Sequence, residues 1–118
     1  MRPRRRWLAV GVVAAVILVA SLLPTSGGPT PTLLGVGLDK WQHLGGYAVL
    51  AGTLGYALVA TEHAGRRVAL GLAVTVGYGI LIECLQAPLS TRVFSVADML
   101  ANAVGALVGT ALVSRFGR

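Results

Sequence analysis

Hydrophobic residues form four long runs along the chain, and polar or basic residues separate them. The runs cover residues 7–23, 41–60, 68–85 and 96–113. A helix needs about 20 residues, within a range of about 17–25, to cross the hydrocarbon core of a bilayer. The runs lack the strict apolar/polar alternation of a membrane β-barrel strand. The pattern therefore predicts one all-α membrane domain over residues 1–118, a compact bundle of four transmembrane helices.

The composition favours the same class of protein. Hydrophobic residues make up 55% of the 118 residues and charged residues only 12%, whereas a soluble domain has about 25% charged residues. The net charge is +6, but the basic residues are distributed as in a multi-pass membrane protein. On one side of the four-helix topology lie Arg2, Arg4, Arg5, Arg6, Arg66, Arg67, Arg115 and Arg118, and on the other side lie Lys40 and Arg92.

This asymmetry predicts that the N- and C-termini are cytoplasmic, because basic residues concentrate on the inner side of a membrane. It places the protein in the bacterial cytoplasmic (inner) membrane, with membrane lipids as partners of the basic residues and without a nucleic-acid partner. The first run also fits the basic and apolar regions of a signal peptide. No convincing cleavage site follows it, so we predict an uncleaved first helix; cleavage would leave three spans.

Polar residues in the last three runs gather where those runs meet the outer face of the membrane. The group comprises Asp39, Lys40, His43 and Tyr47 in the second run, Glu83 and Gln86 in the third, Arg92 in the following loop, and Asp98 and Asn102 in the fourth. Spacings of three or four residues put each pair on one helix face. Ionisable groups within a membrane are costly and are usually functional. We therefore predict one shared polar site at the outer ends of these three helices.

The residue types predict roles within that site. His43 would act as a general base, oriented by Asp39 or Asp98, and Glu83 as a second acid or base. Lys40 and Arg92 would bind a phosphate or carboxylate, with Gln86, Asn102 and Tyr47 as further binding residues. His43, Glu83 and Asp98 are a conceivable metal-ligand set, but the chain has no tight metal-binding motif. We therefore predict neither a metal nor a cofactor. A lipid headgroup or a lipid-linked cell-wall precursor fits a site at this depth.

A structural interpretation competes with the functional one. Asp39 would then cap the second helix, and Ser95 with Asp98 would form a capping box at the fourth. Gly105 and Gly109 form a small-xxx-small pair that lets another helix approach closely. In this alternative the protein is non-catalytic, the polar residues lock the bundle or bind a partner, and glycine-rich faces mediate a homodimer. The lone cysteine, Cys84, cannot form an internal disulfide and is expected to be buried.

The ordered motifs resemble those of the VanZ-like family of small integral membrane proteins. They are DKWQH followed by Tyr47, then ECLQ, then Arg92, then SVADMLANAVGALVG, and they extend over residues 39–109. The family takes its name from a protein associated with low-level resistance to the glycopeptide teicoplanin. The resemblance implies a membrane protein of the cell envelope related to glycopeptide resistance. It implies no particular reaction, so whether the chain is an enzyme stays open.

Overall fold

A computed structural model describes residues 2–23, 30–89 and 95–116 of the chain. Its elements in chain order are α1 (Pro3–Leu22), β1 (Thr32–Leu33), β2 (Val36–Gly37), α2 (Leu38–Leu58), α3 (Ala64–Gln86) and α4 (Val96–Phe116). Each predicted hydrophobic run forms a helix, so the all-α class is confirmed. Arg92 lies outside the described residues, so its predicted binding role stays a prediction.

Local sequence explains where the helices begin. Pro3 lies in the first turn of α1, where its missing N–H costs no helical hydrogen bond. The side chain of His63 accepts a hydrogen bond from the Arg66 amide at the start of α3. The Ser95 hydroxyl accepts one from the Asp98 amide at 3.2 Å, as the capping interpretation predicted for α4.

The predicted cap of α2 is wrong. The N-cap is Gly37, and the helix begins at Leu38, so Asp39 lies inside the first turn. The reason is a β-hairpin that runs directly into the helix and fixes its start, with the Leu38 amide donating to the Pro31 carbonyl at 2.7 Å. Asp39 therefore keeps a favourable position near the positive helix end, but its side chain is available for other partners.

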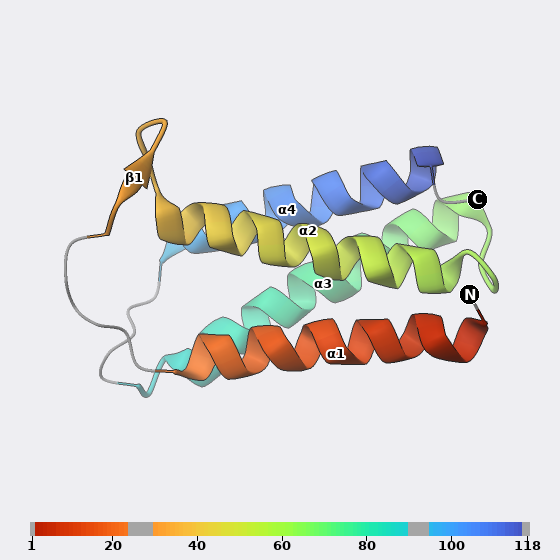
Figure 1. Ribbon diagram of the computed structural model, residues 1–118, viewed down its shortest axis with the longest axis horizontal. Coiled ribbons are helices and arrows are strands. Elements are labelled where there is room, and N and C mark those ends of the chain that lie inside the picture. Colours follow the sequence, from red (N-terminus) through yellow and green to blue (C-terminus); the bar gives the residue numbers. More distant parts are fainter. Residues whose placement is uncertain (1, 24–29, 90–94, 117–118) are drawn as a thin grey trace.

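The hairpin itself was not predicted. Strands β1 and β2 pair antiparallel, and Leu34 and Gly35 between them have positive φ angles of 55° and 76°, as expected for a tight two-residue hairpin turn. The indole N–H of Trp41 donates to the Leu33 carbonyl at 3.0 Å and ties the hairpin to α2. Figure 1 shows the hairpin projecting beyond one end of the helices, and the chain termini at the opposite end.

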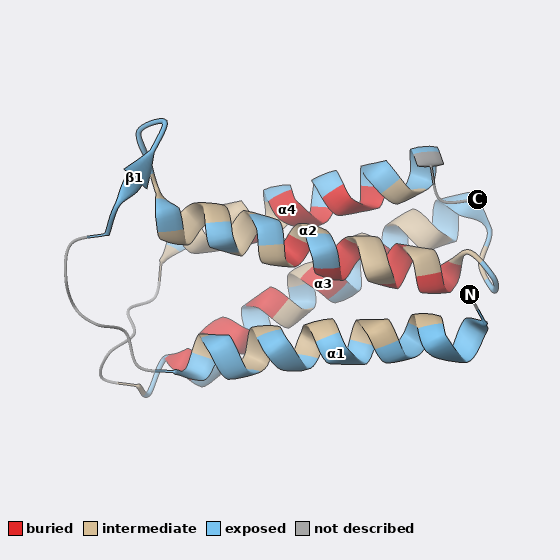
Figure 2. Cartoon of the chain, in the orientation of Figure 1, coloured by how far each residue is buried: buried red, intermediate tan, exposed pale blue. Residues whose placement is uncertain are grey.

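Among the described residues, three helical segments are long and apolar enough to cross a membrane: Pro3–Leu22, Ala64–Gln86 and Val96–Arg115. The chain is therefore a membrane protein. Helix α2, predicted as a fourth span, is not among them. Its first turns carry Asp39, Lys40, Gln42 and His43, which lower its mean hydropathy. Much of the apolar surface of α2 is buried by other helices (Figure 2).

Helix α2 is the centre of the packing and contacts α1, α3 and α4, with its most extensive contact on α4. Gly105 and Gly109 make that contact possible, as the small-xxx-small spacing predicted. A Cβ atom at either position would clash with α2 backbone atoms of Leu44 or Ala48. Both glycines thus pack inside the chain, whereas no atom lies within 4 Å of a Cβ added at Gly45 or Gly77.

The inward face of α3 follows the predicted stripe. Thr75, Gly79, Glu83 and Gln86 are all buried, together with Gly71 and Ile82. Cys84, expected to be buried, is exposed. It follows Ile82 and Glu83 by only one or two positions, and each position rotates a helix by about 100°, which turns the thiol away from the core.

Candidate functional site

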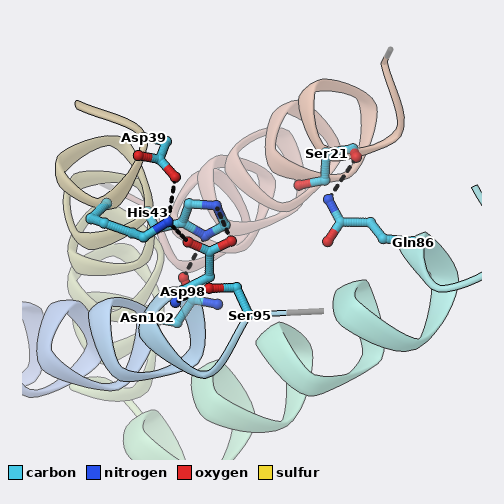
Figure 3. Close-up of polar contacts among 8 residues, drawn as sticks. Ser21, Asp39, His43, Gln86, Ser95, Asp98 and Asn102 are labelled. Carbon is cyan, nitrogen blue, oxygen red and sulfur yellow. Dashed lines mark hydrogen bonds and ion pairs between the residues drawn. The ribbon is translucent and has the colours of Figure 1, made fainter. Parts of the chain in front are cut away.

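The polar site is built around Lys40 in the first turn of α2. Its Nζ atom lies 2.5 Å from Asp39 Oδ2 and 2.7 Å from Asp98 Oδ1 at the start of α4. One ammonium therefore joins two carboxylates and ties the outer ends of two helices together. Figure 3 shows Asp39, His43, Asp98 and Asn102 pointing toward one another from α2 and α4.

Lys40 and Asp39 stabilise each other's charged forms. Both residues precede the predicted membrane segment of α2, which begins at residue 41. The hydrogen bond from Lys40 holds the pKa of the Asp39 carboxyl below its ordinary value. The hydrogen bonds to Asp39 and then to Asp98 raise the pKa of the Lys40 ammonium above its ordinary value. Lys40 is thus an internal counter-ion in this structure, and its predicted role in binding an anionic ligand stays a prediction.

His43 lies one turn deeper and is oriented by two residues of α4. Its Nδ1 atom is 2.8 Å from Asn102 Oδ1, and its Nε2 atom is 3.7 Å from Asp98 Oδ2. Of the two carboxylates predicted to orient His43, Asp98 lies beside the ring, whereas Asp39 is bound to Lys40. The Asn102 oxygen can only accept, so it favours the tautomer in which Nδ1 carries the proton, and Nε2 then faces Asp98.

Tyr47 continues the same face of α2 into the core. Its ring is stacked parallel to that of His43, with centroids 6.5 Å apart. A Cβ atom at Gly79 would lie 3.2 Å from both Tyr47 Cε1 and Asn102 Nδ2, so this glycine lets α3 approach the pair. The Tyr47 hydroxyl is buried and has no hydrogen-bond partner within the described part of the chain.

Glu83 and Gln86 bring α3 to the site, and both are about 95% buried. The Gln86 side chain reaches α1, where its Nε2 atom donates to the Ser21 carbonyl at 2.7 Å (Figure 3). Glu83 lies one turn deeper than Gln86 on the buried stripe of α3. Within the described residues, no group of three or more His, Cys, Asp or Glu side chains is arranged to hold a metal ion, so His43, Glu83 and Asp98 do not converge as such a set.

A cavity of about 290 Å³ opens beside these residues, between α1, α2 and α3 at the end of the molecule opposite the termini (Figure 1). Its walls include Ile17, Ser21, Asp39, His43, Tyr47 and Gln86. A second, mainly apolar groove of about 310 Å³ lies between α2 and α4, and its walls include Lys40, Trp41, Leu44, Leu100 and Val104. The polar cluster thus lies between a cavity of mixed lining and an apolar groove.

The contribution of α1 to the cavity could not be read from the sequence. Ile17 and Ser21 line it, yet the first hydrophobic run carries no polar pair or motif that marks a wall of a site. The only available signal was Ser21, a single hydroxyl residue near the outer end of that run, and serine is common in membrane helices for packing reasons alone.

Comparison with known proteins identifies a family for nearly the whole chain. A family model described as VanZ/LLP1 matches residues 7–117. No curated protein matches the chain, and no solved structure matches it. The family match includes α1 as well as the region that carries the motifs of α2, α3 and α4.

Proposed function

The chain belongs to the VanZ/LLP1 family, and from this premise we propose that it is a multi-pass cell-envelope protein of the bacterial cytoplasmic membrane. In this proposal α1, α2, α3 and α4 all cross the bilayer, with cytoplasmic termini. The basic residues support this orientation, because they lie at the start of α1, at the start of α3 and at the end of α4, and both termini lie at one end of the molecule (Figure 1). Helix α2 tolerates its polar first turns because their charges pair within the bundle.

The proposed function of the site is to bind, or to bind and modify, the headgroup of a membrane lipid or of a lipid-linked envelope precursor. One observation carries this proposal. The polar side chains of three helices converge at the end opposite the termini, next to a cavity of about 290 Å³. A network that served only to lock the helices would have no need of an adjoining cavity, and small-molecule sites are usually such cavities with a few convergent polar groups.

The geometry around His43 is suited to proton transfer if the ligand is modified. Asn102 fixes the ring at 2.8 Å, and Asp98 faces the other ring nitrogen. A base that is oriented by an amide and backed by a carboxylate can take a proton from a hydroxyl or water held in the cavity. Binding without reaction uses the same residues, and turnover of a bound lipid would separate the two.

The test compares the two histidines of the chain. His43→Ala removes the central ring of the site, whereas His63→Ala removes a ring at the exposed turn before α3. We expect His43→Ala to abolish the envelope phenotype, measured as teicoplanin susceptibility in a strain that lacks the chromosomal copy. We expect His63→Ala to retain that phenotype, and both variants to stay folded in detergent, each with a lowered unfolding temperature because each loses a hydrogen bond of the ring.

Two results would contradict the proposal. Equal phenotypes for the two variants would remove His43 from the function. Collapse of the fold in His43→Ala alone would support the structural alternative, in which the cluster locks the helices and performs no chemistry.

A further inference from the structure

We infer that the cavity recognises its ligand through a primary ammonium group, so that the bound headgroup carries an amine. This inference rests on the proposed function, because it names the chemical class of the ligand at the same site. It follows from the charge of the cluster, from the lining of the cavity, and from one buried hydroxyl.

The charge of the cluster is the first observation. Lys40 supplies one positive charge to two carboxylates, at 2.5 and 2.7 Å, so one negative charge remains while His43 is neutral. The sequence gives the same sign for the whole outer end, where Asp39, Glu83 and Asp98 outnumber Lys40 and Arg92 by three to two. A ligand group that approaches this end meets an excess of carboxylate.

The lining of the cavity is the second observation. Among the described residues that line it, Asp39 is the one carboxylate, and neither Lys nor Arg is present. The Asp39 side chain is 40% exposed, so a ligand can reach it. Lys40 lines the apolar groove on the other side of the cluster instead, and its Nζ atom is shared between Asp39 and Asp98.

The neutral groups of the lining can also accept from a hydrogen-bond donor. Gln86 uses one N–H of its amide on the Ser21 carbonyl, and its Oε1 atom can accept. An ammonium group has three donors and no acceptor, and a carboxylate with amide oxygens satisfies it well. A phosphate would find no Lys or Arg among the described residues of this lining, and the excess negative charge of the cluster would repel it.

The Tyr47 hydroxyl is the third observation. It belongs to a residue that lines the cavity and is only 3% exposed. The hydroxyl has no partner among the residues that the structure describes. Burying a polar group without a partner is costly, and a polar group of a ligand in the cavity would offer the missing partner, directly or through water.

The experiment measures which lipid the purified full-length chain retains in native mass spectrometry. The protein is exchanged into mixtures of phosphatidylethanolamine with its N-acetylated form, which keeps the phosphate and loses the ammonium, or with phosphatidylglycerol. We expect a preference of about tenfold for phosphatidylethanolamine, the factor that one charge-assisted hydrogen bond of ordinary strength supplies.

Two variants localise the effect. Asp39→Asn is expected to remove the preference for the free amine, while Glu62→Gln, which changes a carboxylate at the opposite end of α2 that pairs with Arg66, is expected to keep it. The wild-type comparison of free and acetylated amine needs no variant, so it remains decisive if Asp39→Asn fails to fold.

A further experiment offers a lipid-linked precursor with an amine on its peptide. Preferential retention of that precursor assigns the ammonium to the precursor rather than to the bulk lipid.

The outcomes distinguish this inference from the proposed function. Equal or better retention of the N-acetylated lipid or of phosphatidylglycerol would overturn the ammonium inference and leave a headgroup site in place. Absence of retained lipid in every mixture would overturn both.

Discussion

Helix α2 is packed against α4 on one side and against α1 on the other, and the two contacts are built differently. On the α4 side, Gly105 and Gly109 bring backbone against backbone, and ion pairs close the outer end. On the α1 side, no residue of α1 is buried, and a long side chain makes the contact: the Arg6 guanidinium lies over the Tyr56 ring and donates to the Tyr56 carbonyl. Figure 2 shows this contrast along the two helices.

The contrast distinguishes two parts of the proposed site. His43, Asp98 and Asn102 lie on the tightly packed side, where close backbones set the distances between these side chains. The cavity lies on the loosely packed side, next to α1. The difference teaches that the hydrogen-bonded polar residues and the space beside them lie in parts of the fold that are packed to different degrees.

The strongest way to break this contrast is Gly109→Ala. The added Cβ would clash with the α2 backbone at Ala48 and lie 2.9 Å from the Gly52 amide nitrogen, so the helices must separate. We expect a loss of about 1–3 kcal/mol in the free energy of unfolding, measured by denaturant unfolding in detergent micelles. Gly77→Ala is the control, because a Cβ there meets no atom within 4 Å; comparable losses in both would show that α2 and α4 are not in close contact.

A second prediction concerns the polar part of the tight side. Asn102→Ala removes the partner of His43 Nδ1 and leaves a partly buried ring nitrogen without its hydrogen bond, which costs about 1–3 kcal/mol. Gln42→Ala, on an exposed position of α2 one residue away from His43, is expected to change the unfolding free energy by less than about 0.5 kcal/mol. Equal effects of the two substitutions would mean that Asn102 does not face the site.

The smallest effect on stability is expected on the loose side. Gln86→Ala removes the hydrogen bond to the Ser21 carbonyl and should cost about 1 kcal/mol or less. Its main effect should be a broader distribution of distances between α1 and α3. The native Cys84, which is exposed, and a cysteine at the exposed Val19 provide positions for two spin labels. An unchanged distribution would show that this hydrogen bond does not hold α1 in place.

The sequence predicted the helices and their inward faces because both depend on local spacing. The run at residues 96–113 became α4 over Val96–Phe116, and the spacing of Glu83, Gln86, Gly79 and Thr75 correctly identified the buried side of α3. The four-residue spacing of Gly105 and Gly109 predicted that another helix packs closely on α4. It did not identify that helix, which the structure shows to be α2.

What the sequence did not predict depends on which helices are neighbours. Helical phase places Asp39 and His43 on one face, but it does not show that Lys40 reaches Asp98 on α4 or that Asn102 binds His43. The start of α2 was misplaced because the hairpin before it has no Asn-Gly or Asp-Gly signal; the turn uses Leu34 and Gly35 instead. The contact of Gln86 with α1 joins a side chain to a backbone carbonyl, an atom that every residue has and no motif marks.

The position of α1 has a consequence for how a lipid would arrive. This helix has no buried residue and forms one wall of the cavity. Gln86 bonds its end beside the cavity, whereas Tyr78 and Arg6 join the rest of it to α3 and α2. A small outward tilt of that wall would open the cavity laterally, to molecules diffusing within the leaflet. An amphiphile could then bring its polar end to Asp39 while its tails stay among other lipids, and it would never have to pass through water.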